Sequence, residues 1–265
     1  MKKELLKYSD TEIGIPEIKK LLSVDLDARL PKSESKGYEP FYPETTALIL
    51  AATFGYTDLV SILIAYGADV NLFNSHGGTA LHGALKRQHG SIVELLLSAQ
   101  ADPDIKDMYG KTALHYACSQ ADYQLLKMII KAGADLKAQD NDRQTALILP
   151  AYNGRTEFID LLLEAGIHPD VKDKSGFTAL TWAAQNGQTQ SVKTLIQGQA
   201  DVNVKSKKGI TPLMSATIKG DIESVQLLIL AGADVRAEEK GGYTAWTFAT
   251  KNKQDAIARL LEESQ

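Results

Sequence analysis

The chain has 265 residues, of which 44% are hydrophobic and 23% charged, and its formal net charge is -4. The apolar fraction excludes a wholly disordered chain, and the near balance of charge gives no global attraction to nucleic acid or anionic membrane. A single cysteine excludes a disulfide framework and any multi-cysteine metal site. We therefore expect a globular protein of a reducing compartment, without a metal or other cofactor.

The first residues lack the apolar core and small-residue cleavage site of a secretory signal. The most apolar stretch, 46–70, contains Gly55 and Asp58, so we expect two short helices there and no membrane insertion. These features favour a cytoplasmic protein. They leave open export of a bacterial effector into a host cytosol by a specialised secretion route.

The sequence repeats itself every 33 residues from about residue 41 onward. Thr-Ala-Leu at 46–48 returns six times at this step, with one residue replaced in each of the last two copies. Gly-Ala-Asp at 67–69 recurs in most copies, with glutamine in place of glycine in two of them. The threonines that begin the copies are Thr46, Thr79, Thr112, Thr145, Thr178, Thr211 and Thr244.

Each copy has the pattern of a helix, a turn and a second helix. The threonine predicts an N-cap, and the alanines that follow allow a short helix to approach its neighbours. The second helix carries apolar pairs four residues apart, such as Leu59 and Val60 with Leu63 and Ile64. Glycines such as Gly67 predict left-handed helix ends, and a later glycine in the polar link predicts a hairpin tip.

At this point the sequence resembles the ankyrin repeat family. Thr112–Ala117 and Thr79–His82 resemble its Thr-Pro-Leu-His-x-Ala signature. The resemblance implies an all-α solenoid of stacked helix–turn–helix units joined by β-hairpin loops, in a single domain of residues 1–265. We expect a degenerate N-terminal capping unit with a long loop at 1–40, six full repeats at 41–238 and a C-terminal capping repeat at 239–265.

The fourth repeat departs from the pattern in two places. Arg143 replaces the hairpin glycine, and Pro150 lies within the expected first helix. A proline inside a helix removes one hydrogen bond and clashes with the preceding turn. We therefore predict a local kink or an altered spacing between Tyr116 and Tyr152.

Candidate catalytic residues have simpler structural roles. His82 and His115 occupy the same repeat position, where an imidazole hydrogen-bonds a neighbouring loop in this family. Cys118 occupies a small-residue position and is interpreted as a buried thiol. The repeated aspartates, such as Asp69, are interpreted as loop-forming. Since no phosphate loop, serine elbow or metal-spaced cluster is present, we expect a protein without enzymatic activity.

The resemblance implies recognition through the hairpin tips and the exposed ends of the first helices. Carried over position by position, it gives these candidate partner-binding residues: Tyr42, Phe54, Phe73, His76, Met108, Tyr109, Tyr152, Asn153, Lys174, Phe177, Lys207 and Lys208. Aromatic residues gather in the first half and centre, and lysines toward the end. Exposed aromatics are typical of protein-binding hot spots. We therefore expect a protein–protein interaction scaffold or adaptor that is monomeric by itself.

Two other functions remain open. The C-terminal lysines could bind nucleic acid or another acidic ligand, although the net charge disfavours nucleic acid. The chain could also be a regulatory subunit of an enzyme, with a polar pocket around His115, Tyr116, Tyr152 and Asn153. Asn71 and Asn203 match the Leu-x5-Asp-Val-Asn pattern of hydroxylated asparagines in ankyrin proteins, but a turn-stabilising role is sufficient for both.

Overall fold

The computed structural model describes residues 27, 42–120 and 122–264, and it divides into two compact units, 1–135 and 136–265. The described residues form fourteen helices, and their only β-pairing is an isolated bridge between Phe73 and Thr79. The predicted all-α fold is confirmed. The predicted N-terminal capping unit, 1–40, lies outside the described residues except for Asp27, and the grouping of all repeats in one domain stays a prediction.

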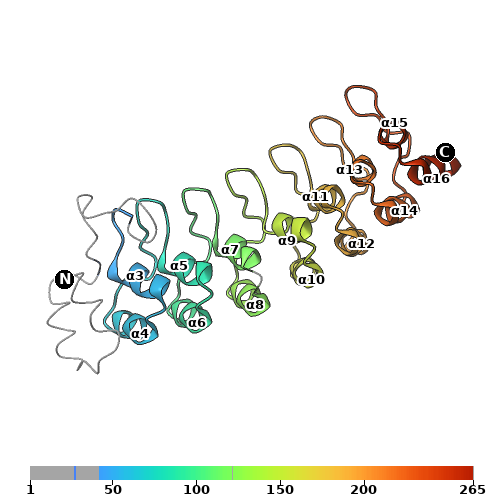
Figure 1. Ribbon diagram of the computed structural model, residues 1–265. Coiled ribbons are helices and arrows are strands. Elements are labelled where there is room, and N and C mark those ends of the chain that lie inside the picture. Colours follow the sequence, from blue (N-terminus) through green and yellow to red (C-terminus); the bar gives the residue numbers. More distant parts are fainter. Residues whose placement is uncertain (1–26, 28–41, 121, 265) are drawn as a thin grey trace. The chain divides into compact units, whose positions relative to one another are not determined.

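Unit 1 contains three described helix pairs. The pairs are α3 (Ala47–Phe54) with α4 (Thr57–Ala65), α5 (Ala80–Lys86) with α6 (Gly90–Ser98), and α7 (Ala113–Ser119) with α8 (Tyr123–Lys131). The first helices α3, α5 and α7 pack side by side, and the second helices form a neighbouring row (Figure 1).

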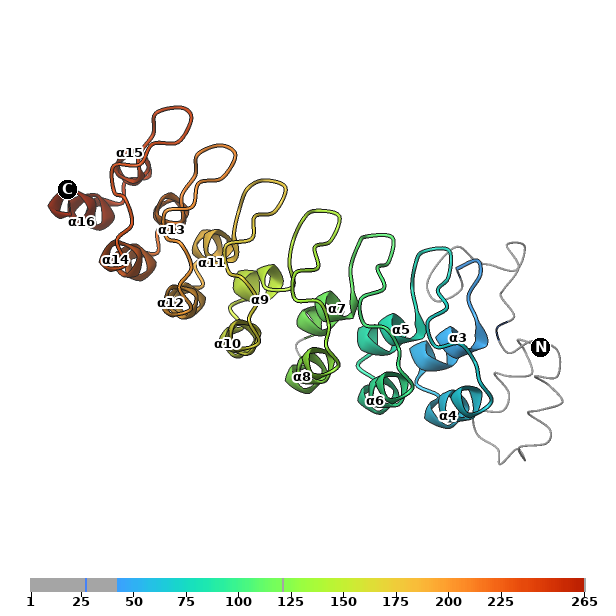
Figure 2. The same cartoon turned by 180° about the vertical axis from the view of Figure 1, so that it is seen from behind.

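Unit 2 repeats this arrangement with four helix pairs. They are α9 (Ile148–Asn153) with α10 (Thr156–Glu164), α11 (Ala179–Asn186) with α12 (Thr189–Gln197), α13 (Pro212–Lys219) with α14 (Ile222–Leu230), and α15 (Ala245–Lys251) with α16 (Asp255–Glu263). Seen from behind, the connections of this unit project as loops from the row of first helices (Figure 2).

The predicted caps explain where the helices begin and end. Thr46 and Thr211 accept hydrogen bonds from the backbone N–H groups of Ile49 and Met214, as the N-cap prediction requires. Gly55 ends α3 with φ 83°, a left-handed conformation that costs glycine little. Local sequence therefore determines where these helices begin and end. Thr145 is an exception to the predicted caps, because the N-cap of α9 is Leu147.

The apolar pairs of the second helices form the core of each unit. Leu63 and Leu96 in unit 1, and Leu162 and Leu195 in unit 2, are 0% exposed. At the C-terminal end, Glu262 is exposed and its Oε1 accepts a hydrogen bond from Trp246 Nε1 at 2.8 Å. A carboxylate there gives the last repeat a polar outer side where the other repeats carry an apolar residue.

The fourth repeat accommodates its proline by beginning its helix later. α9 starts at Ile148 with Leu147 at the N-cap, two residues beyond the position at which the other first helices start. Pro150 is therefore the third residue of the helix, where an N–H would have no acceptor within the helix. Instead of a kink inside a full-length helix, the structure shows a shortened one. Arg143 takes the left-handed conformation of the missing glycine, with φ 59°.

The late start of α9 predicts that proline is tolerated at position 150 but destabilising at position 183, the equivalent position of the next repeat. Pro150→Ala changes the free energy of unfolding by less than about 1 kcal/mol, because that residue's N–H is outside the helical ladder. Ala183→Pro lies one repeat later in the interior of α11 and costs about 3 kcal/mol or more. Urea unfolding followed by circular dichroism measures both, and equal effects would contradict the late helix start.

Candidate functional site

Each connection between repeats ends in a closed loop of five residues, which we call a finger. The six described fingers are 74–78, 107–111, 140–144, 173–177, 206–210 and 239–243. In each, the N–H of the first residue donates to the carbonyl of the fifth, as from Asp107 to Lys111 at 3.0 Å. The predicted hairpin tips are confirmed: Gly77 and Gly176, for example, have φ 72° and 82°.

A side-chain oxygen on the first residue of each finger holds the loop closed. Asp173 Oδ1 accepts from the N–H groups of Ser175 and Phe177 at 2.8 and 2.9 Å. The other fingers use the same geometry with an amide, carboxylate or hydroxyl oxygen. We call these residues finger-base residues: Asn74, Asp107, Asp140, Asp173, Ser206 and Glu239.

Backbone and side-chain hydrogen bonds join successive repeats within each unit. Met108 N–H donates to His76 O at 2.7 Å, and Lys207 N–H to Ser175 O at 3.0 Å. Asn71 Oδ1 accepts from Asp102 N–H at 2.7 Å, and Asn203 Oδ1 from Asp234 N–H at 2.7 Å. Both asparagine side chains thus link successive repeats, whereas the sequence predicted a role within a local turn.

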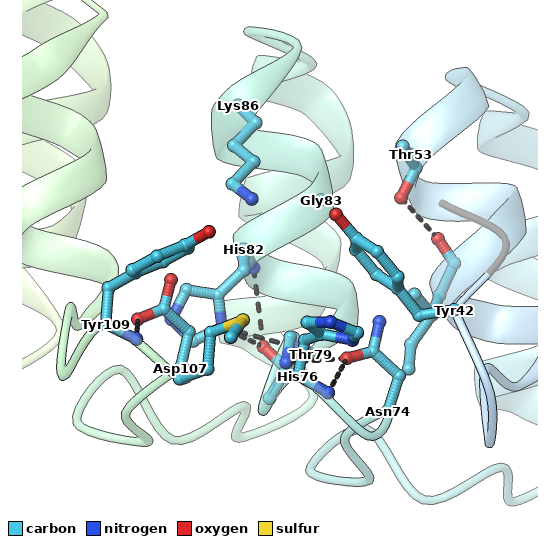
Figure 3. Close-up of a pocket in the computed structure, with 13 residues that line it drawn as sticks. Tyr42, Thr53, Asn74, His76, Thr79, His82, Gly83, Lys86, Asp107 and Tyr109 are labelled. Atoms are coloured by element: carbon cyan, nitrogen blue, oxygen red, sulfur yellow. Dashed lines mark hydrogen bonds between the residues drawn. The ribbon is translucent and has the colours of Figure 1, made fainter. Parts of the chain in front are cut away.

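In unit 1, fingers 74–78 and 107–111 border a hollow beside α5. Four candidate partner-binding residues line it: Tyr42, His76, Met108 and Tyr109. The Tyr42 and His76 rings stand 3.7 Å apart, and Figure 3 shows Tyr109 on the opposite side. The hollow has about 450 Å³ of space, including the open solvent above it. The other two candidates of this unit, Phe54 and Phe73, are 41% and 48% exposed and do not line the hollow.

His82 also lines this hollow, and its side chain forms hydrogen bonds that include one to finger 107–111. Thr79 N–H lies 3.2 Å from His82 Nδ1, so this nitrogen accepts, and Nε2–H donates to Lys111 O at 3.3 Å. Burial lowers the pKa of His82 from 6.5 to about 4, against the opposing influence of Asp107 and of the Lys111 carbonyl. A neutral imidazole at pH 7 fits the loop-bonding role predicted for it.

In unit 2, the structure brings two candidates together through a residue that was not among them. The Trp182 ring centroid lies 5.8 Å from that of Tyr152 and 5.4 Å from that of Phe177. Trp182 Nε1 donates to Asp173 Oδ2 at 3.0 Å, so the finger-base carboxylate also holds the aromatic cluster. Asn153 is exposed at the end of α9, next to Tyr152.

The candidate lysines lie on the fingers of unit 2 and are exposed. Lys174 Nζ lies 3.4 Å from Asp142 Oδ1, with the two side chains 59% and 73% exposed, so this pair contributes little to stability. Lys207 and Lys208 occupy the tip of the next finger. Lys207 N–H donates to Ser175 O, and Lys208 O accepts from Lys240 N–H, so both backbones are bonded to neighbouring fingers. Both side chains are exposed to solvent.

The remaining candidate chemistry, metal binding and the single thiol, concerns residues 27, 42–120 and 122–264. No group of three or more His, Cys, Asp or Glu side chains there could hold a metal ion. The thiol of Cys118 is buried, with 0% exposure, as the sequence predicts. None of the helices in these ranges combines the length and apolarity needed to cross a membrane.

Comparisons with known proteins agree with this fold. The family model described as ankyrin repeats (3 copies) matches residues 14–107, 48–140, 114–206 and 180–265. The chain belongs to the ankyrin repeat family. Human Rabankyrin-5 is 38% identical over 64 residues, which cover 24% of this chain and only 6% of Rabankyrin-5.

Two solved structures are similar over most of the chain. The ankyrin repeat domain of Bcl-3, described as a unique member of the IkappaB protein family, is 31% identical with a TM-score of 0.73. The match covers 81% of this chain and 98% of that one. An ankyrin repeat domain from Acinetobacter baumannii AYE is also 31% identical, with a TM-score of 0.68 and coverage of 71% and 98%.

The depressed pKa of His82 predicts a specific loss of stability in mild acid. Above pH 6.5 the imidazole is neutral whether the chain is folded or unfolded. Below it the unfolded chain binds a proton that the folded chain does not, so stability is lost as pH falls toward 4. Between pH 7 and pH 5 this loss is about 2 kcal/mol. Urea unfolding of His82→Gln should lack this part of the slope, whereas His168→Gln should retain it; identical slopes would contradict the assignment.

The finger-base role of Asp173 predicts a second effect. Asp173→Ala leaves three donors without their acceptor and lowers the free energy of unfolding by about 1–3 kcal/mol. It also releases Trp182, whose fluorescence should shift to the red in a Trp246→Phe background. Asp160→Ala, at an exposed position of α10, is the matched control and should change neither measurement.

Proposed function

We propose that this chain is a non-enzymatic scaffold or adaptor that binds a protein partner through its fingers and the adjoining ends of its first helices. We call this side of each unit the finger surface. One observation carries the proposal: large apolar side chains are exposed on or beside fingers such as 107–111, whose backbone N–H groups are all occupied in hydrogen bonds. Tyr109 and Phe73 are 58% and 48% exposed on or beside fingers, and Tyr152 is 43% exposed on α9.

The energetics of binding favour this arrangement. A flexible loop loses conformational entropy when it binds, whereas these fingers are already ordered by their finger-base oxygens and by bonds to the neighbouring finger. Tyrosine contributes a large apolar contact area with few rotatable bonds, which is why it is enriched at interface hot spots. The family membership supports a protein as the partner, since ankyrin repeats are generally protein-interaction modules.

A second candidate function is binding of an acidic ligand by unit 2. Lys205, Lys207 and Lys208 are exposed within four consecutive positions around one finger. An acidic segment would be attracted there by an interaction that weakens as salt increases. Charge reversal at Lys207 and Lys208 would abolish such binding while leaving a tyrosine-dependent partner bound. The proposed regulatory pocket needs His115 and Tyr116 of unit 1 together with Tyr152 and Asn153 of unit 2, and it stays a prediction.

We also infer that the protein acts in the cytoplasm, or in a host cytosol if it is an exported bacterial effector. The support is compositional: the sequence contains one cysteine and therefore no disulfide within the chain, which suits a reducing compartment. We further infer that the chain is monomeric by itself.

The proposal predicts that aromatic side chains of the finger surface control partner capture. Tyr109→Ala combined with Tyr152→Ala should reduce recovery of co-purifying proteins from the native cell by about tenfold or more, the size of one good hot spot. Leu230→Ala is the matched control, because Leu230 is 85% exposed at the end of a second helix, and recovery should be unchanged. Full recovery with the folded double variant would contradict the proposed surface.

A further inference from the structure

The hollow of unit 1 exists because one repeat lacks a side chain that its neighbours have. Gly83 occupies a position of the first helix that is filled in the other repeats by Leu50, Tyr116, Leu149, Trp182, Ser215 and Phe248. A Cβ at Gly83 would overlap Thr53 Oγ1, which is fixed by a hydrogen bond to Ile49 O at 2.7 Å. Glycine is therefore required by the close approach of α5 to α3, and it leaves the space beside it open.

The walls of this space are suited to an apolar side chain. The Tyr42 and His76 rings, tilted by 30° with their centroids 3.7 Å apart, form one side, and Tyr109 forms the other (Figure 3). Met108 also lines the hollow, and Met108 and Tyr109 are 49% and 58% exposed. Aromatic faces and a thioether are adaptable contacts for an aromatic or aliphatic group. The hollow is open to solvent, so such a side chain can enter it from outside.

Two charged side chains line the hollow, and they differ in burial: Asp107 is buried, whereas Lys86 is half-buried. The Asp107 carboxylate is 9% exposed and accepts from the Tyr109 and Lys111 N–H groups and from the Tyr116 hydroxyl. This carboxylate is therefore well supplied with hydrogen-bond donors and buried beneath the fingers. Lys86 Nζ lies 4.9 Å from the Tyr116 ring centroid, and Figure 3 shows this side chain directed toward the hollow between Tyr109 and Tyr42. The cation thus stands at the mouth, where an incoming anion would meet it.

We propose that this hollow binds a partner segment in which a large apolar residue lies next to an aspartate or glutamate. The apolar side chain enters between Tyr42 and Tyr109, and the carboxylate pairs with Lys86. The proposal rests on the proposed function, since it names the chemistry of the partner that unit 1 recognises. A carboxylate at a partly buried lysine gains more than one at a fully exposed lysine, because water screens the pair less.

The test begins with selection from a random peptide library displayed on phage, using the full chain as bait. We expect the enriched peptides to carry an aromatic or large aliphatic residue within two positions of Asp or Glu. The affinity of the most enriched peptide, measured by fluorescence anisotropy, should fall about tenfold with Lys86→Met and with Tyr109→Ala. Arg87→Met removes an exposed charge at the adjacent position, which does not line the hollow, and should change the affinity less than about twofold.

A double-mutant cycle identifies the partner of Lys86. Replacing the peptide's carboxylate by its amide should weaken binding to the wild-type chain about tenfold but have little further effect on Lys86→Met. Independent effects of the two changes would overturn the pairing. Selection that yields no peptides, or peptides without the acidic–apolar pattern, would overturn the proposal as a whole.

The outcome separates this inference from the proposed function. If Lys86→Met leaves every peptide bound while the Tyr109 and Tyr152 double variant still loses its cellular partner, the acidic–apolar segment is wrong and the scaffold role stands. If the double variant retains its cellular partner, the finger surface is wrong even where a peptide binds the hollow.

Discussion

The structure depends on one interaction that recurs in every described finger: a side-chain oxygen accepts two backbone N–H groups, two and four residues later in the chain. Asn74, Asp107, Ser206 and Glu239 all do this, although their side chains differ in length and charge. Without it, a partly buried finger such as 173–177 would leave backbone N–H groups without a protein acceptor, at a cost of about 1–3 kcal/mol. With it, a loop of five residues keeps a fixed shape, and the side chains at its tip are not needed to close it.

The finger-base residues also connect the fold of each repeat to the surface that we propose binds a partner. In two of the three repeats whose finger-base residue is aspartate, its second oxygen reaches the first helix and holds an aromatic side chain: Tyr116 for Asp107 and Trp182 for Asp173. In the Asn74 repeat the residue nine positions later is Gly83, and the same location is a hollow. One repeat position is therefore filled and structural in some repeats and open for a partner in another. Variation at that position can change specificity while the apolar core of each unit stays the same.

The sequence predicted the parts of the fold that depend on local chemistry. The period, the glycine ends, the apolar faces of the second helices and the threonine caps other than Thr145 are each determined within one repeat, and the structure confirms them. The start of α9 could not be predicted, because Pro150 can be accommodated either by a kink or by a late start, and tertiary packing decides between them. The finger-base residues were missed because they share only an acceptor oxygen and no residue type. Trp182 was missed because its role appears only when Asp173, Tyr152 and Phe177 are placed around it.

The central claim is that the ordered fingers and first helices form the surface that meets the partner. Hydrogen–deuterium exchange of the full chain, alone and with a co-purified partner, tests it most directly. The account predicts slower exchange at finger amides such as those of Tyr109 and Ser175 and in first helices such as α5, with α4, α6 and α12 unchanged. Protection confined to the second helices, with the fingers exchanging as in the free chain, would contradict it.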